Sequence, residues 1–327
     1  MPSAYLNCYF HFQLTRSPAL KNTFCRLVFL FLPFLGLAAT AAETAPGKEK
    51  ALQLDLWNGI LLGIVQGVTE FLPISSSAHL KVVPMALGLG DPGEALTAVI
   101  QLGSIVAVLW YFRNDILGLI RGSLTALQKR DFANHDLRLS VGIALGTLPI
   151  CVLGLAIKLF FKTQYESARS LLAIAIAAIV LSLLLFLAEK MAKHIRSFED
   201  ASFRDCLLIG TAQALAIFPG VSRSGATLTA ALFSGLKRSD AARFSFLLGI
   251  PAIVIAGVVE MKEVLEHGTQ CPLFPLAVSV VAAAISSYLA IDWMISFLKK
   301  HDTSVFILYR LCFGVAILVW IFCQGNK

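Results

Sequence analysis

The stretch TEFLPISSSAH, Thr69–His79, interrupts an apolar run with a carboxylate, a proline, three consecutive serines and a histidine. The apolar residues that lead into it, Leu56–Leu72, are few for a membrane-spanning helix, which takes about 20. At membrane depth, polar and irregular backbone is tolerated only where it is buried in protein or lines a wet cavity. In a membrane protein, this stretch would therefore mark a functional segment.

The composition is that of a polytopic helical membrane protein. Of the 327 residues, 57% are hydrophobic and 14% are charged, whereas soluble domains are roughly 45–50% apolar and about 25% charged. Apolar and polar residues do not alternate as they would in a transmembrane β-barrel. We therefore expect an all-α integral membrane protein.

The net charge of +7 does not indicate nucleic-acid binding. The basic residues lie in short connections between apolar segments, where positive charge reports topology instead. The seven cysteines are scattered without the spacing of a metal site, and we interpret them as small hydrophobic residues. The sequence thus predicts no nucleic-acid partner.

Residues 1–50 differ from the rest of the chain. Lys21 and Arg26 precede the apolar run Leu27–Leu37, and Ala39-Thr40-Ala41 follows as an A-x-A site. This is the layout of a secretory signal peptide. We expect an N-terminal extension at 1–50 that is cleaved near Ala41, with an extra membrane anchor or an early start codon as the alternatives.

Two stretches of the chain match each other. GIVQGVTEFLPISSSA (Gly63–Ala78) and GTAQALAIFPGVSRSG (Gly210–Gly225) align at a constant offset, and a long apolar segment follows each. The matched pairs are Gly63 with Gly210, Gln66 with Gln213, Phe71 with Phe218, Ser75 with Ser222, and Ser77 with Ser224. The match indicates an internal duplication. We expect one membrane domain at 51–327, with repeat one at about 56–188 and repeat two at about 206–322.

Loop charge and the number of spans predict an inverted repeat. Six apolar segments are long enough to be full spans, at about 96–112, 139–161, 171–188, 244–259, 274–297 and 305–322. Three of them separate the two copies, so the second copy starts on the opposite side of the membrane. The connections 113–138 and 189–205 are rich in Lys and Arg, which indicates the cytoplasm. The first copy is therefore predicted to start outside and the second inside.

The two motif segments are predicted to be broken. Leu56–Leu72 and Cys206–Phe218 both end close to a proline and a run of small polar residues. We interpret each as a re-entrant hairpin of two half-helices, with the two tips meeting near the centre of the membrane. Broken helices at the midplane of an inverted repeat are the usual sign of a substrate site.

Glu70 is the main candidate of the first tip, because an intramembrane carboxylate costs at least about 2.5 kcal/mol and is functional by default. Its alternative role is to pair with a structural arginine. Gln66 lies one helical turn earlier on the same face. The serines of Ser75–Ser77 follow the broken turn, where hydroxyls and a helix N-terminus favour an anion. His79 can act as an acid, a base or a phosphate partner, or can bond only a backbone carbonyl.

Arg223, within PGVSRSGAT (Pro219–Thr227), is the main candidate of the second tip. A guanidinium matches phosphate oxygens in a bidentate way and keeps its charge when buried. Hydroxyls flank it at Ser222, Ser224 and Thr227. Opposite the first tip, this set predicts phosphoryl chemistry, in which a serine or water attacks and Glu70 and His79 manage protons or a metal. A site reached from within the bilayer suits a lipid phosphate.

Five motifs in this order resemble those of the undecaprenyl-diphosphatase family, which is associated with bacitracin resistance. They are EFLPISSSAH, VIQLGSIVAVL (Val99–Leu109), PGVSRSGAT, FSFLLGIP (Phe244–Pro251) and FILYR (Phe306–Arg310), and the similarity runs from about Leu56 to Phe322. The resemblance implies a homodimeric enzyme of the bacterial inner membrane. Such an enzyme converts undecaprenyl diphosphate to the monophosphate and phosphate on the periplasmic side, recycles the lipid carrier for peptidoglycan synthesis, and uses a divalent cation, Mg or Ca.

The resemblance also implies roles for single residues. The essential glutamate of the family matches Glu70, which is also the candidate cation ligand. Its proposed serine nucleophile matches Ser76, its histidine matches His79, and its arginine matches Arg223. From the residues alone, the nucleophile stays open among Ser76, His79 and water.

The chain departs from the family pattern at three positions. The family usually has a second glutamate where this chain has Gln66, and Thr and Gly where it has Ser77 and Ala78. An amide oxygen can still coordinate a hard cation, so we do not interpret Gln66 as inactivating. The alternative function is a transporter or flippase for polyprenyl phosphate, which an inverted repeat would also suit.

Overall fold

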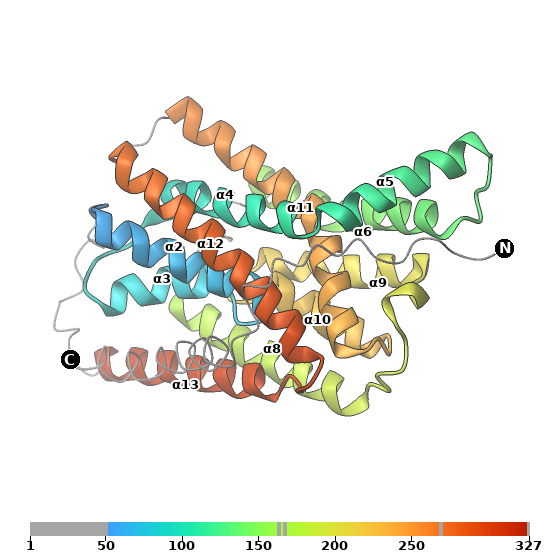
Figure 1. Ribbon diagram of the computed structural model, residues 1–327. Helices are drawn as coiled ribbons and strands as arrows, with labels where there is room; N and C mark the ends of the chain where they lie inside the picture. Colours follow the sequence, from blue (N-terminus) through green and yellow to red (C-terminus); the bar gives the residue numbers. More distant parts are fainter. Residues whose placement is uncertain (1–51, 162–164, 166–168, 268–270, 326–327) are drawn as a thin grey trace.

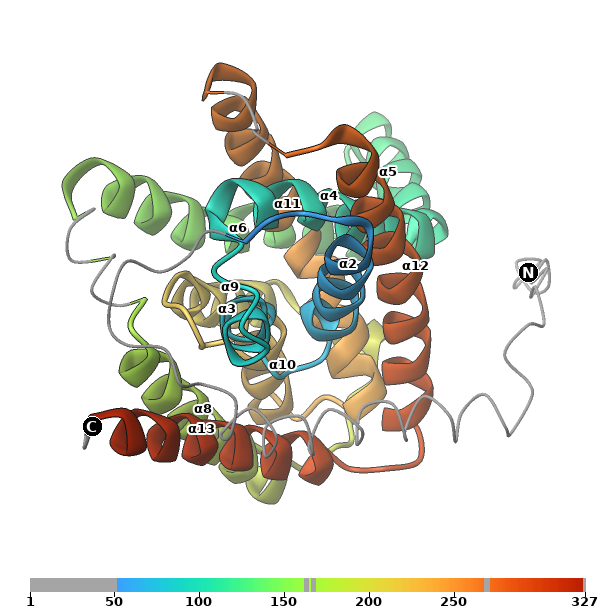
Figure 2. The ribbon, with the colours of Figure 1, turned by 90° about the vertical axis from the view of Figure 1, so that its left-hand side faces the viewer.

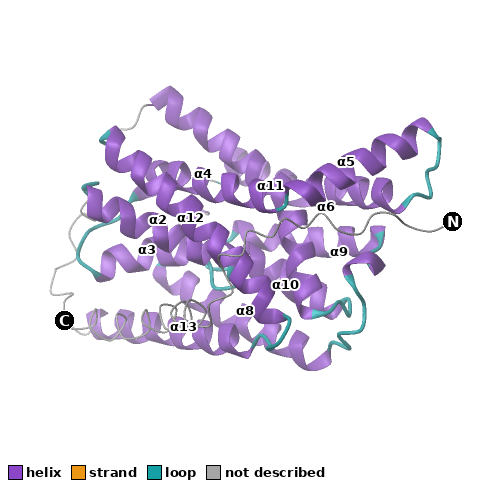
Figure 3. Cartoon of the chain, in the orientation of Figure 1, coloured by secondary structure: helices purple, strands orange, loops and turns teal. Residues whose placement is uncertain are grey.

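The computed structural model describes residues 52–161, 165, 169–267 and 271–325. The predicted extension at 1–50, with its cleavage site near Ala41, lies outside these residues. The described residues form helices joined by loops and contain no strand (Figure 3). The α-helices are α2 (Leu56–Phe71), α3 (Ser76–Ala86), α4 (Gly93–Tyr111), α5 (Arg113–Gln128), α6 (His135–Phe160), α8 (Leu171–Met191), α9 (Phe203–Gln213), α10 (Arg223–Phe233), α11 (Arg238–His267), α12 (Leu273–Leu298) and α13 (Ser304–Gly325).

Six helices among the described residues are long and apolar enough to cross a membrane, namely α4, α6, α8, α11, α12 and α13. They coincide with the six spans predicted from hydropathy, which confirms an all-helical, multi-pass membrane protein. Their outer faces carry exposed apolar side chains such as Val152 and Leu155 of α6, which are 65% and 58% exposed. In a bilayer such faces contact lipid.

The charged segment 113–138 is more ordered than expected. The sequence was interpreted there as a connection, whereas α5 occupies Arg113–Gln128 and Asn134 caps the start of α6. Leu117, Ile120 and Leu124 follow one another at three- and four-residue spacing, which is the period of a helix. The ion pair of Asp115 with Arg243 ties α5 to α11.

The short helices lie at the centre of the molecule. Figures 1 and 2 show α2, α3, α9 and α10 surrounded by the six long helices. The 3-10 turn η2 (Ala214–Ile217) continues α9, and α10 begins six residues after η2 ends. The long helices therefore surround the two pairs of short ones, although α9 keeps an exposed face, on which Leu208 is 55% exposed.

In each pair of short helices, the chain that leads into the first helix lies next to the chain that leaves the second. Next to the α2–α3 pair, the Leu52 amide donates to the Asp91 carbonyl at 3.0 Å. Next to the α9–α10 pair, the Arg196 amide donates to the Gly235 carbonyl at 3.0 Å, and the Lys237 amide donates to the Arg196 carbonyl at 2.8 Å. Both pairs are thus helical hairpins closed at their outer ends.

Close backbone contacts hold the two hairpins in place, and they explain one matched pair of the repeat. A Cβ at Gly63 of α2 would stand 2.8 Å from the Ala282 Cβ of α12. A Cβ at Gly210 of α9 would stand 2.5 Å from the Gly146 Cα of α6. Only glycine permits this approach of two helix backbones.

Candidate active site

The tips of the two hairpins have the same backbone conformation. Ser75 has φ 78° and Ser222 has φ 64°, and each immediately precedes a helix, α3 or α10. Positive φ is unusual for a residue with a side chain, and such strain gathers at functional sites. The first amides of α3 and α10 are therefore presented at the tips, where a helix N-terminus favours an anion.

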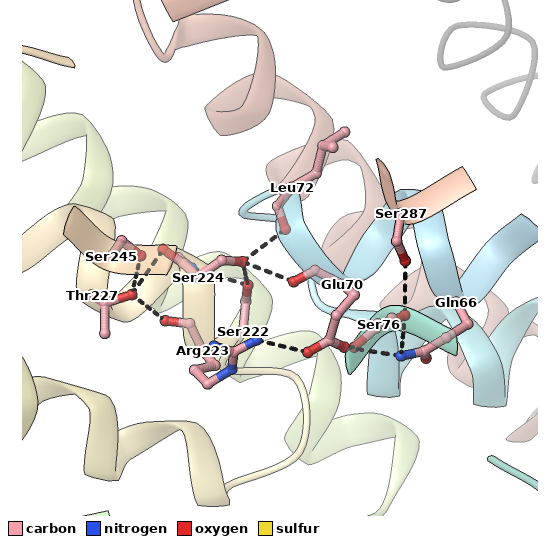
Figure 4. Close-up of polar contacts among 12 residues, drawn as sticks. Gln66, Glu70, Leu72, Ser76, Ser222, Arg223, Ser224, Thr227, Ser245 and Ser287 are labelled. Atoms are coloured by element: carbon pink, nitrogen blue, oxygen red, sulfur yellow. Dashed lines mark hydrogen bonds and ion pairs between the residues drawn. The ribbon is translucent and has the colours of Figure 1, made fainter. Parts of the chain in front are cut away.

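The two tips meet through Glu70 and Arg223 (Figure 4). Arg223 Nη2 donates to Glu70 Oε1 at 2.8 Å. Ser76 Oγ donates to the other oxygen, Glu70 Oε2, at 2.6 Å, and Gln66 Nε2 donates to it at 3.1 Å. The carboxylate thus lies between the arginine of one hairpin and the hydroxyl of the other.

Exposure divides the tip residues into two groups. Ser76 and Arg223 are half-buried and Ser77 is exposed, whereas Glu70 is only 9% exposed. Gln66, Ser75, His79, Ser222, Ser224 and Thr227 are also buried. Ser76, Ser77 and Arg223 are therefore the least buried of these tip residues.

Gln66 continues into a polar chain that the sequence analysis missed. Its Nε2 also donates to Ser104 Oγ of α4 at 3.4 Å, and Ser287 Oγ of α12 donates to the same oxygen at 2.8 Å. Ser104 belongs to the motif VIQLGSIVAVL, which was noted only as a resemblance. This chain fixes the amide so that its nitrogen points to Glu70.

The hydroxyls of the second tip join the hairpins to each other. Ser224 Oγ donates to the Leu72 carbonyl at 3.0 Å and lies 3.2 Å from Ser222 Oγ. The equivalent serines of the first tip, Ser75 and Ser77, are also 3.2 Å apart. The bond from Ser224 Oγ satisfies the Leu72 carbonyl, which is left free where α2 ends.

Thr227 is held within its own helix and against α11. Its Oγ1 donates to the Arg223 carbonyl at 2.8 Å and contacts Ser245 Oγ. The hydroxyl therefore supports the backbone that carries the guanidinium.

His79 lies behind the tip. Its Nδ1 is 2.7 Å from the Ser75 carbonyl and its Nε2 is 2.7 Å from the Tyr309 hydroxyl. The ring stacks on Phe313, with centroids 4.3 Å apart. Both nitrogens are thus engaged, one of them with a backbone carbonyl, as the alternative interpretation of this residue had it.

Arg310 is a second arginine of the site, and the sequence analysis gave it no role. It is only 1% exposed. Its Nη1 donates to the Pro73 carbonyl at 3.1 Å, and its Nη2 donates to the carbonyls of Gly220 and Val221 at 3.1 and 3.2 Å. One guanidinium thereby clamps the turns of both tips. The motif FILYR, which ends in this residue, was the only signal for it.

The residues present do not by themselves enclose a metal ion. Among the described residues, no group of three or more His, Cys, Asp or Glu side chains is close enough to hold one. Glu70 is the single carboxylate of the tips, and both of its oxygens accept hydrogen bonds. A site of this kind fits a cation that is shared with the phosphate oxygens of a ligand, as Mg²⁺ commonly is.

Comparison with known proteins shows which family the chain belongs to. The family of bacitracin resistance protein BacA matches residues 59–316, which include both tips. The chain belongs to this family. An undecaprenyl-diphosphatase of Nostoc sp. is 59% identical over 285 residues, covering 86% of this chain and 89% of the relative. Undecaprenyl-diphosphatases of Synechocystis sp. and Synechococcus elongatus are 55% and 56% identical, covering 86% and 83% of this chain and 87% and 94% of the relatives.

Proposed function

We propose that this member of the bacitracin resistance family hydrolyses undecaprenyl diphosphate to undecaprenyl phosphate and inorganic phosphate. The proposal rests on the contacts of Glu70 with Arg223 and Ser76. They bring together a guanidinium that can bind phosphate, a carboxylate that can take up a proton and a hydroxyl that can act as the nucleophile. The relatives are named undecaprenyl-diphosphatases, which supports undecaprenyl diphosphate as the substrate. The reaction would recycle the lipid carrier for cell-wall synthesis and confer resistance to bacitracin.

Arg223 binds the terminal phosphate of the substrate in this proposal. Its guanidinium and the amides that start α3 and α10 neutralise charge on the phosphate oxygens as it develops in the transition state. The exposed hydroxyl of Ser77 adds a donor, whereas the buried hydroxyls of Ser75 and Ser222 hold the two tips in shape through their bonds to Ser77 and Ser224. Ser224 and Thr227 support the second tip through the protein bonds described above.

Attack on the terminal phosphorus comes from Ser76 Oγ or from a water molecule in its place. Glu70 Oε2, 2.6 Å from Ser76 Oγ, accepts the proton. The bond between the terminal phosphorus and the bridging oxygen breaks, and undecaprenyl phosphate leaves with the electron pair. If Ser76 attacks, water then hydrolyses the phosphoserine.

His79 was a catalytic candidate, and such a role requires it to release the Ser75 carbonyl or the Tyr309 hydroxyl. We propose instead that its contacts position Ser75 and the start of α3. The imidazole would then not contact the phosphate, and would affect the reaction only by holding the first tip in its conformation.

We propose a divalent cation, Mg or Ca, as the cofactor. Glu70 would hold it together with phosphate oxygens of the substrate, and it would neutralise negative charge there. Gln66 would add its Oε1 only after its amide turned, because its Nε2 faces Glu70 Oε2 at 3.1 Å.

The placement in the membrane is part of the proposal. We propose an inverted repeat at about 56–188 and 206–322 within one membrane domain, and re-entrant hairpins α2–α3 and α9–α10. The chain would lie in the inner membrane as a homodimer, with its site open to the periplasm. The closure of each hairpin at its outer end supports the re-entrant path.

Phosphate release by the purified full-length protein tests the proposed function. The parent should release one phosphate from each undecaprenyl diphosphate, and more slowly with a chelator. Glu70→Gln should abolish release while the protein still folds, since only the ionisable group is changed. Binding of the lipid by the parent without any phosphate release would instead favour the transporter or flippase.

A further inference from the structure

Gln213 is the second-repeat equivalent of Gln66, and the two amides have different surroundings. Gln66 donates to Glu70 and to Ser104. Gln213, the last residue of α9, is 0% exposed, and neither its Nε2 nor its Oε1 has a hydrogen-bond partner among the described residues. Both copies of the repeat thus have glutamine at this position, but only Gln66 forms hydrogen bonds with other described residues.

Such a side chain is unusual in a buried position. An amide loses its bonds to water on burial, so native proteins rarely bury one without a partner. An apolar residue of similar length, such as methionine, would fill the same space without that loss. The amide of Gln213 is therefore explained best by a ligand that binds to it.

The position of the amide indicates which ligand. A Cβ placed on Gly249 of α11 would lie 3.7 Å from Gln213 Oε1 and 3.1 Å from Arg223 Cζ, and would collide with Arg223 Nη1. The amide oxygen of Gln213 and the guanidinium of Arg223 thus both lie beside Gly249. Arg223 Nη2 is bonded to Glu70, so Gln213 lies toward the other terminal nitrogen of the same guanidinium.

We propose that Gln213 is a further substrate-binding residue, which donates from Nε2 to a non-bridging oxygen of the phosphate that Arg223 holds. An amide carries one oxygen acceptor and two N–H donors, and a negative ligand binds the donors, so the N–H groups of Gln213 are the ones that would meet the phosphate. This inference rests on the proposed function for the identity of the ligand, a lipid diphosphate. It adds a neutral donor to a site whose positive charge is already paired with Glu70.

The experiment uses the purified full-length protein with Gln213→Met and, in parallel, Gln213→Leu. We expect kcat/KM for undecaprenyl diphosphate to fall about ten- to a hundredfold, the effect of losing a hydrogen bond to a charged group. The affinity for the same lipid, measured on a Glu70→Gln background that does not turn over, should fall by a similar factor. The melting temperature without lipid should stay the same or rise, because a buried unpaired amide is removed.

Gln128→Leu is the matched control, since it makes the same change at the exposed end of α5. It should keep the parent's kcat/KM. A Gln213 variant that keeps the parent's kcat/KM and lipid affinity would overturn the proposal, as would a lower melting temperature with unchanged kinetics. If the parent binds the lipid without releasing phosphate, the proposed hydrolysis fails, and the affinity measurements on the parent and the Gln213 variants still decide the role of Gln213.

Discussion

The carboxylate of Glu70 pairs with Arg223 at 2.8 Å, although the same guanidinium is proposed to bind the substrate. Arg223 can serve both partners because a guanidinium carries five N–H donors in one plane. An ammonium group is a point charge without that fork. The proposed role of Arg223 therefore requires the shape of arginine as well as its charge.

Arg223→Lys should lower kcat/KM at least about a hundredfold even though the charge is kept, because the lysine cannot hold Glu70 and a phosphate together. Phosphate release by purified protein measures this. Arg121→Lys, at an exposed position of α5, is the control and should be neutral. Turnover of Arg223→Lys within threefold of the parent would exclude the proposed role.

Gln66→Glu tests the position where the chain departs from the family pattern. The amide nitrogen lies 3.1 Å from Glu70 Oε2, so a glutamate would place two carboxylates together. They repel unless a proton or cation lies between them. We expect stronger dependence on divalent cation and higher turnover at saturating metal, measured as phosphate release against cation concentration. Superimposable curves for the parent and the variant would mean that Gln66 only packs.

At the scale of elements, α11 supports the site by leaving room. Gly249 faces Arg223, and the flexible end of that side chain occupies the space where a Cβ would stand. In Gly249→Ala the guanidinium has to move while the helix stays. We expect kcat/KM to fall about ten- to a hundredfold with little change in melting temperature.

Gly118→Ala on α5, where a Cβ would meet nothing within 4 Å, is the control for Gly249→Ala. It should leave both kcat/KM and melting temperature unchanged. Equal activity of the two variants would show that the position of Arg223 tolerates the displacement.

The outer end of α9 depends on an ion pair that lies outside the six spans. Arg196 donates to both oxygens of Asp205, at 2.9 and 2.6 Å, and Asp205 Oδ2 also accepts from the Ser202 amide in a capping box. Burial raises the pKa of Asp205, but the bonds from Arg196 and Ser202 outweigh it, so the pKa is lowered. The stability from this pair is complete above the ordinary pKa of about 3.9 and is lost as the pH falls through the lowered one.

Asp205→Asn should therefore melt at a lower temperature at neutral pH. The decline of the parent's melting temperature as the pH falls through the lowered pKa should be weaker in this variant. Thermal unfolding in detergent over a series of acidic pH values measures both effects. An equal dependence on pH in the parent and the variant would show that another group causes the acid sensitivity.

For the whole molecule, the sequence predicted what depends on local composition. Hydropathy located all six long helices, and proline with small polar residues located the breaks next to Ser75 and Ser222. It could not locate Arg310, whose three acceptors lie about 90 and 237 positions away in the chain. Nor did the sequence reveal α5, because the Lys and Arg residues of 113–138 were interpreted only as a sign of a cytoplasmic connection. Contacts between distant segments follow from packing, which one sequence does not display.

The opposite direction of the two hairpins is the proposal that governs the whole molecule. Gln53 is exposed just before α2, and Lys237 is exposed between α10 and α11, so each lies where its hairpin closes. If the repeat is inverted, these two ends lie on opposite sides of the membrane. The Lys and Arg residues near the second hairpin, including Lys190, Lys193 and Arg196, favour the cytoplasm for that end.

Single cysteines at these two positions, in a chain from which the native cysteines have been removed, test the arrangement. Gln53→Cys should react with a membrane-impermeant maleimide in intact spheroplasts, because the first hairpin opens to the outside. Lys237→Cys should react only after the membrane is disrupted. Labelling of both from one side would exclude an inverted repeat. The reverse pattern would keep the inversion and turn the whole protein over, which would place the outer end of the second hairpin, rather than the first, in the periplasm.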